Sequence, residues 1–191
     1  MWLRAGVPAD SQDLFTLQRS AALAAYGHIF PQDRYPFPEQ QVAALCWRML
    51  TSTTERVLVA VGDNGPVGYV SHERDLITNL YVAPDQWHRG IGGRLLAAAV
   101  DAITDAGHGT CRLKVMTENH RARELYQRRG WQPDGTSEQV RFPPHPTLLG
   151  YRLTVTRPTA GTAAAAPTSG STGAPADASG TAPARTDPPH D

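Results

Sequence analysis

The chain has 191 residues, and its 18 basic side chains balance its 18 acidic ones. A neutral chain lacks the basic field on which broad binding to nucleic acid or to anionic membranes depends, so we expect neither partner. No apolar run approaches the roughly 18 residues that a membrane span needs, and the opening MWLRAGVPAD does not resemble a signal peptide. Cys46 and Cys111 lack metal-ligand spacing, which is typical of reduced, buried thiols and favours a cytoplasmic protein.

The predicted elements begin with a short strand at 2–4. Asp10 is then placed to cap a helix that runs to about Tyr26, with apolar side chains at helical spacing. Three prolines make 30–38 a loop, and the helical period resumes over 39–50. The first part of the chain therefore predicts one strand followed by two helices.

Three strands are expected next, because short runs rich in β-branched residues alternate with turn signals. The sequence GDNGP between the first two is typical of a hairpin turn, and Pro84 closes the third strand. We expect the three strands to pair as an antiparallel meander. They are expected at 56–61, 67–72 and 76–82.

The period changes after Gly90, because the apolar side chains over 91–103 fall on one face of a helix. A strand follows at 110–116, in which apolar and basic side chains alternate. Asn119 is placed to cap another helix, which Gly130 ends.

The last β segments are expected at Trp131, in the 138–142 region and over 148–156. The resulting order is βααβββαβαββ. It predicts an α/β fold, a single domain in which helices cover a mixed sheet.

The end of the chain, 158–191, contains no Val, Ile, Leu, Met, Phe, Trp or Tyr. Such a segment cannot bury enough apolar surface to offset the entropy lost on ordering, so we expect a disordered tail rich in Ala, Pro, Gly and Thr. The folded domain is accordingly expected at 1–157. The tail could tether a protein partner, but nothing in its sequence supports that role positively.

Three glycines, Gly90, Gly92 and Gly93, stand where the strand ending near Val82 leads into a helix. The N-terminus of a helix presents unpaired N–H groups and a positive dipole end, and glycine lets a diphosphate approach the backbone. A dinucleotide-binding G-x-G-x-x-G pattern fails because Leu95 takes the sixth position, and no lysine completes a Walker A loop. By themselves the glycines indicate little more than a tight turn.

Two segments together resemble the motifs of the GNAT superfamily of N-acetyltransferases. LYVAP at 80–84, followed by GIGG at 90–93, resembles the acyl-CoA motif, and 119–131 resembles the second motif, N-x-x-A-x-x-L-Y-x-x-x-G-[FW]. The resemblance covers about 80–131 and implies a GNAT-like fold and direct transfer of an acetyl group from acetyl-CoA to a primary amine. The pattern departs from the family at Trp87, where Gln or Arg is usual, and at His88, where a small residue is common.

The resemblance implies acetyl-CoA as co-substrate. We expect no metal, because the histidines are scattered and show no metal-ligand pattern. The backbone of Leu80 and Val82 is expected to pair with the pantetheine arm where the strand at 76–82 splays from its neighbour. A backbone N–H near Tyr81–Val82 is expected to polarise the thioester carbonyl. A contact of Arg121 or Arg123 with the 3′-phosphate of coenzyme A is one interpretation, and a solvent-exposed helix face is the alternative. The other expected coenzyme contacts are His88, Arg89, Gly90, Ile91, Gly92, Gly93, Arg94, Asn119 and Tyr126.

The resemblance places Tyr126 at the position of a general acid that protonates the leaving thiolate, and a packing aromatic is the alternative. The family's carboxylate base would stand where this chain has Leu76. Asp75 and Glu73 are nearby candidates for the base, or merely charges at the end of a strand. Cys111 could suggest a covalent nucleophile, but its strand position indicates a small core residue.

The acceptor is not identified by the sequence. By resemblance the early helices border its cleft, and aromatic side chains there would suit a small aromatic amine, although core packing explains them equally well. A peptide N-terminus, a polyamine and an antibiotic amine stay open, as do a monomer and a homodimer. A non-catalytic acyl-CoA-binding regulatory module is the second interpretation. The aromatic side chains are Tyr26, Phe30, Tyr35 and Phe37.

Overall fold

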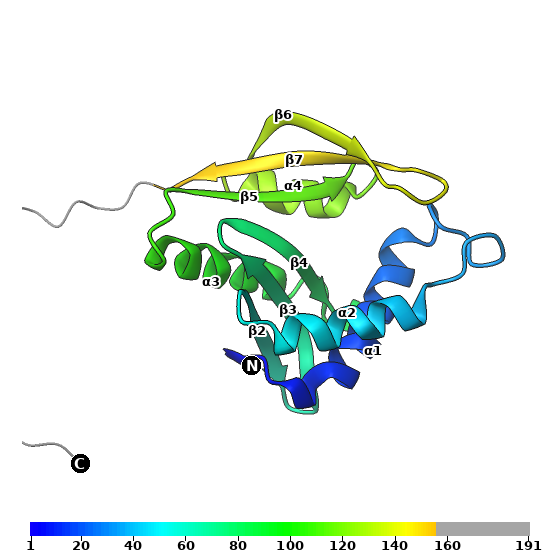
Figure 1. The fold of residues 1–191 in the computed structure, drawn as a ribbon, viewed down its shortest axis with the longest axis horizontal. Coiled ribbons are helices and arrows are strands. Elements are labelled where there is room, and N and C mark those ends of the chain that lie inside the picture. The colour runs from blue at the N-terminus through cyan, green and yellow to red at the C-terminus, as the bar shows by residue number, and fades with distance from the viewer. Residues whose placement is uncertain (156–191) are drawn as a thin grey trace, which may run out of the picture. The chain divides into compact units, whose positions relative to one another are not determined.

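A computed structural model describes residues 1–155, and the predicted tail at 158–191 lies outside them (Figure 1). Seven strands form one sheet in the order β1-β2-β3-β4-β5-β7-β6. The elements follow one another in the predicted order, with two short 3-10 turns in addition. They are β1 (Trp2–Ala5), η1 (Pro8–Asp10), α1 (Ser11–Tyr26), α2 (Glu39–Thr51), β2 (Glu55–Gly62), β3 (Gly65–Glu73), β4 (Leu76–Val82), η2 (Pro84–Gln86), α3 (Ile91–Asp105), β5 (Thr110–Met116), α4 (His120–Arg128), β6 (Gln132–Gln139) and β7 (Thr147–Thr154).

One face of β2 and β3 is covered by α1 and α2. Alternate residues of a strand point to opposite sides of the sheet, so only every second side chain faces these helices. Leu14 and Leu17 of α1 and Met49 of α2 pack there against Val59 and Tyr69. These side chains form a core that belongs to the first half of the sheet alone.

The other face is covered by α3 and α4. The predicted apolar face of α3 is buried, including Leu95 and Ile103, and it shares one core with Val70 of β3, Leu113 of β5 and Tyr151 of β7. In β5 the odd-numbered side chains from 111 to 115 are buried and the even-numbered ones exposed, which confirms the predicted alternation. This second core joins both halves of the sheet.

The meander of β2, β3 and β4 is confirmed, with antiparallel pairing throughout. The first turn contains two residues, since Gly62 pairs directly with Gly65. By contrast, β4 pairs with β5 in parallel, and only at its beginning, through Leu76 with Arg112 and Ile77 with Leu113. From Thr78 onward β4 parts from β5, as expected (Figure 1).

Two local predictions were wrong. Asp10 does not cap α1 with its side chain, because its carboxylate instead accepts two bonds of 2.6 Å from Arg4 and one of 2.9 Å from the Val7 N–H. The segment expected as a strand at 138–142 lies mostly in a loop, since β6 ends at Gln139. Nearly all side chains of β6 are exposed at this edge of the sheet, so burial imposes no apolar alternation on its sequence.

None of the helices within residues 1–155 is long and apolar enough to cross a membrane. In the same part of the chain, no three His, Cys, Asp or Glu side chains are grouped so that they could hold a metal ion.

Candidate functional site

On the side that faces β5, the second half of β4 has peptide groups that no neighbouring strand pairs with. The Ala83 N–H donates to the Val67 carbonyl at 3.0 Å, and Tyr81 lies opposite Tyr69 in the same register. Because alternate residues of an antiparallel ladder turn their peptide groups to the same neighbour, the N–H and C=O of Leu80 and Val82 face away from β3. They face the side where β5 has parted, so the edge can pair with an extended ligand.

Next to this edge, α3 begins with its first amides turned toward the loop. Gly90 is the N-cap residue with φ +77°, a left-handed conformation that favours glycine, and its carbonyl accepts the Arg94 N–H at 3.1 Å. His88 is also left-handed, with φ +64°. The side chains of His88, Arg89 and Arg94 are exposed, so they border the loop without sealing it.

The other two glycines of this helix meet the protein itself. A Cβ on Gly93 would collide with the guanidinium of Arg129, whose Nη1 donates to the Gly93 carbonyl at 2.7 Å. A Cβ on Gly92 would make ordinary contacts of 3.6 Å with Leu125 and 3.7 Å with Val82. The interpretation of all three glycines as space for a diphosphate is therefore incomplete, since Gly93 also admits an arginine from the end of α4.

Trp87 lies in the loop between η2 and α3 and spans the space between β4 and α4. Its indole Nε1 donates to the Val82 carbonyl at 2.7 Å. The guanidinium carbon of Arg121, in the first turn of α4, lies 3.4 Å from the centre of the Trp87 rings. Trp87 thus takes one of the free acceptors of the β4 edge and leaves the Val82 N–H and both groups of Leu80.

Asn119 joins the start of α4 to the end of α1. Its Oδ1 accepts the Ala122 N–H at 3.2 Å, which confirms it as the N-cap of α4. Its Nδ2 donates to the hydroxyl of Tyr26 at 3.1 Å. Tyr26, expected on the border of the acceptor cleft, is therefore held against the second motif.

Tyr126 is 7% exposed, with its ring packed 6.1 Å from that of Trp131 and 6.2 Å from that of Tyr151. Burial, with a smaller effect of nearby Tyr26, raises the pKa of Tyr126 above its ordinary value of 10.0, so the phenol stays protonated at neutral pH. Its hydroxyl has no hydrogen-bond partner within residues 1–155. Because His72 Nε2 is the one fully enclosed, unpartnered side-chain nitrogen or oxygen in that range, the Tyr126 hydroxyl oxygen retains some accessible surface.

The two candidate bases do not join this group. Asp75 lies in the turn before β4 and forms a two-pronged ion pair with Arg112, at 2.8 and 2.9 Å. The Arg112 guanidinium lowers the pKa of Asp75, so the carboxylate is a poor proton acceptor. Glu73 accepts a bond of 2.6 Å from the Thr54 hydroxyl. Asp75 directly precedes β4, and Glu73 ends β3 opposite Leu76. At about 3.3 Å per residue, both therefore lie roughly 20 Å from Val82, at the other end of β4.

Cys111 is fully buried on the face of β5 that packs beneath α3. Burial raises the pKa of its thiol from 9.0 to about 11, and Cys46 shows the same shift. Both cysteines are unpaired. A protonated, enclosed thiol is a poor nucleophile, so the structure favours the core interpretation of Cys111.

The loop between α1 and α2 meets the loop between β6 and β7. The ring of Phe30 lies 5.9 Å from that of Phe142 and 6.4 Å from that of Tyr35. The two loops lie side by side in Figure 1. Sequence reasoning missed Phe142, because the contact joins residues far apart in the chain and no motif includes it.

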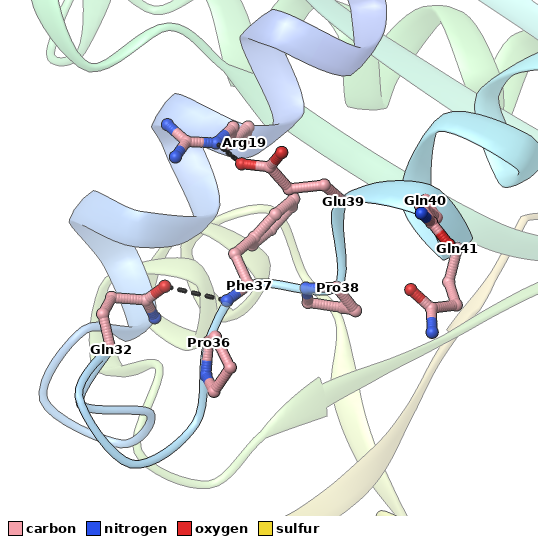
Figure 2. Close-up of a pocket in the computed structure, with 8 residues that line it drawn as sticks. All are labelled: Arg19, Gln32, Pro36, Phe37, Pro38, Glu39, Gln40 and Gln41. Atoms are coloured by element: carbon pink, nitrogen blue, oxygen red, sulfur yellow. Dashed lines mark hydrogen bonds and ion pairs between the residues drawn. The ribbon is translucent and has the colours of Figure 1, made fainter.

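Two hollows lie outside the group of motif residues. The larger, of about 610 Å³, is lined by the α1–α2 loop and the start of α2, and Figure 2 shows Arg19 paired with Glu39 and Gln32 bonded to the backbone of Phe37. The second, of about 340 Å³, lies over β5, β7 and β6. None of the expected coenzyme contacts lines either hollow, whereas Phe37 of the expected acceptor residues lines the first.

The family model described as Acetyltransferase (GNAT) family matches residues 21–131. The uncharacterized N-acetyltransferase YhfO of Bacillus subtilis is 34% identical over 91 aligned residues, and the match covers 42% of this chain and 61% of that protein. The chain thus spans less than two thirds of this relative.

Solved structures show the same fold. A GCN5-related N-acetyltransferase from Rhodopseudomonas palustris matches with a TM-score of 0.68 at 18% identity, over 81% of this chain and 95% of that one. The ribosomal-protein-S18-alanine N-acetyltransferase of Escherichia coli matches with a TM-score of 0.63 at 17% identity, over 84% and 97%. The PaiA N-acetyltransferase of Thermoplasma acidophilum, in complex with coenzyme A, matches with a TM-score of 0.60 at 18% identity, over 78% and 98%.

Proposed function

Since this chain belongs to the acetyltransferase (GNAT) family, we propose that it moves an acetyl group directly from acetyl-CoA to a primary amine. The observation that carries the proposal is the side of β4 that faces away from β3, where both peptide groups of Leu80 and the N–H of Val82 have no partner strand. The activity is assigned to residues 1–157, the domain expected from the sequence. The cytoplasmic location expected from the cysteines stays a prediction.

The residues at the start of α3 fit a coenzyme diphosphate. Backbone amides at a helix N-terminus that no carbonyl of the helix can satisfy are donors for phosphate oxygens. Gly92 has no side chain over them, although the packing of the protein would tolerate one. We assign the diphosphate to the amides from Gly90 to Gly93 and the pantetheine arm to the edge of β4. Acetyl-CoA would supply a thioester, whose carbonyl carbon takes up the amine.

Tyr126 is assigned as the general acid. Its buried ring is fixed by packing, its phenol is protonated at neutral pH, and its hydroxyl is not fully enclosed and has no partner in residues 1–155. Such a hydroxyl can donate its proton to a sulfur that departs as thiolate. Asn119 supports the arrangement from the start of α4, since it caps the helix and holds the Tyr26 phenol nearby.

The amine must lose a proton for the reaction to run. Because Asp75 is bound to Arg112 and Glu73 to Thr54 at the far end of β4, we assign neither of them as the base. We propose that the amine enters as the free base or gives its proton to solvent. The ribosomal-protein alanine that the Escherichia coli protein of the same fold acetylates is one model of such an acceptor, because α-amino groups have a pKa near 8.

One observation favours a second candidate function. Leu76 stands where the family's carboxylate would be expected, so the chain could bind acyl-CoA as a regulatory module without catalysis. Calorimetric titration with acetyl-CoA, followed by thiol release with a panel of primary amines, separates the two candidates. Binding with turnover supports the enzyme, and binding without turnover on any amine supports the module. Absence of binding by folded protein refutes both.

The acid role is tested by Tyr126→Phe, which keeps the ring and removes the hydroxyl. We expect turnover to fall by about 10²-fold or more while acetyl-CoA affinity changes little. Tyr151→Phe is the matched control, because this neighbouring buried phenol accepts bonds of 3.4 Å from Arg123 and 3.5 Å from Gln127 within the protein. Turnover that is unchanged in Tyr126→Phe would remove Tyr126 from the acid role.

A further inference from the structure

The contact between Trp87 and Arg121 joins the loop before α3 to the first turn of α4. Trp87 is fixed from one side by the bond of 2.7 Å from its Nε1 to the Val82 carbonyl. Arg121 lies against its ring face, with the guanidinium carbon 3.4 Å from the ring centre. This distance is well inside the ~6 Å at which a cation and an aromatic face attract each other. The indole is therefore a rigid platform that determines where the guanidinium lies.

Arg121 differs from the other arginines of this helix in what its N–H groups do. Arg123 donates to the Thr117 carbonyl, and Arg129 to the Gly93 carbonyl. Arg128 pairs with Glu124. Within residues 1–155, no carboxylate pairs with Arg121 and no acceptor takes its N–H groups. Partial burial disfavours the charged form of Arg121 and lowers its pKa, as expected for a cation without a nearby counter-ion.

The position of this cation matches the proposed phosphate site. Trp87 precedes Gly90 by three residues, so the stacked guanidinium lies beside the loop that leads into α3. A planar guanidinium that is held in one orientation and retains free donors suits the oxygens of a phosphate group. The stacking face is occupied by the indole, which leaves the edges of the guanidinium to bind the anion.

We propose that Arg121, held on the Trp87 platform, binds a phosphate group of coenzyme A, either the diphosphate or the 3′-phosphate. This inference rests on the proposed function of the same site. It also gives Trp87 a role at the position where the family usually has Gln or Arg. The indole does not bind the phosphate itself but orients the arginine that does.

The test is calorimetric titration with coenzyme A, and with 3′-dephospho-coenzyme A, of the full chain and of four variants, one of which combines two substitutions. Arg121→Gln should weaken coenzyme A binding by about tenfold or more, as expected for loss of a charged hydrogen bond. Trp87→Leu removes the platform and should weaken binding through Arg121, so that adding Arg121→Gln to it costs less than in the original chain. Arg128→Gln is the matched control on the same helix and should bind as the original chain does.

The dephospho ligand identifies the phosphate. If Arg121→Gln weakens binding of both ligands equally, the partner is the diphosphate. If it weakens binding of coenzyme A alone, the partner is the 3′-phosphate. The inference is overturned if Arg121→Gln binds coenzyme A within twofold of the original chain, or if Arg128→Gln loses as much. If the original chain binds no coenzyme A, the proposed function itself fails, which is a separate outcome. Circular dichroism of each variant checks that it is folded.

Discussion

Gly93→Ala should change the sign of its effect on stability when Arg129 is removed. Alanine is favoured over glycine inside a helix by up to about 1 kcal/mol. A Cβ at residue 93, however, collides with the guanidinium of Arg129 and displaces it from the Gly93 carbonyl. A hydrogen bond from a charged donor contributes about 1.5–3 kcal/mol, and the lower part of this range applies to a partly buried pair. The net expectation is a destabilisation of about 1 kcal/mol.

In an Arg129→Ala background the collision and the bond are both absent, so only the helix preference remains. Gly93→Ala should then stabilise the protein by about 0.5–1 kcal/mol. Urea unfolding of the four proteins completes the cycle, with a coupling free energy of about 2 kcal/mol expected between the two residues. If Gly93→Ala lowers the free energy of unfolding equally in both backgrounds, Arg129 is not the reason for this glycine.

Two further predictions concern the dependence of stability on pH. The carboxyl pKa of Asp10 is lowered, chiefly by its bonds from Arg4, so its contribution is present above pH 3.8 and lost as pH falls through the folded-state pKa. Asp10→Asn should cost about 1–3 kcal/mol at pH 7 and flatten the fall in unfolding free energy between about pH 5 and 3; an equally steep fall would contradict the assignment. The pKa of Cys111 is raised to about 11, so its contribution is complete below pH 9.0 and lost as pH rises through 11. Cys111→Ala should reduce the slope of unfolding free energy against pH near pH 10 by up to about 1.4 kcal/mol per pH unit, and an unchanged slope in denaturant titrations would show that the thiol does not titrate there.

Elements with a buried face could be predicted from the sequence. The apolar stripe of α3 and the alternation in β5 are consequences of burial on one side, and both were placed correctly. Where burial is absent the signal is absent too, and β6 at the exposed edge of the sheet was misplaced for that reason. Asp10 was misassigned because a cap and an ion pair use the same residue type, and the choice depends on where Arg4 lies in space.

The candidate site shows the same contrast between local sequence signals and contacts that depend on the folded chain. The residues expected to meet the coenzyme could be named because two local motifs contain them. The contacts of Trp87 with Arg121 and of Tyr26 with Asn119 could not, because each joins segments that only the folded chain brings together. The candidate bases show the opposite error, in which closeness in sequence to β4 did not mean closeness to the open edge.

The sheet has two halves, β1 to β4 and β5 to β6, and both pack against the core beneath α3. The core beneath α1 and α2, by contrast, packs against the first half alone. Beyond this core, the two halves are also joined by the bond from Asn119 to Tyr26 and by the ring contact of Phe30 with Phe142. Because the core beneath α3 packs against both halves of the sheet, we expect its buried side chains to resist any widening of the gap between β4 and β5, although they lie away from the proposed site.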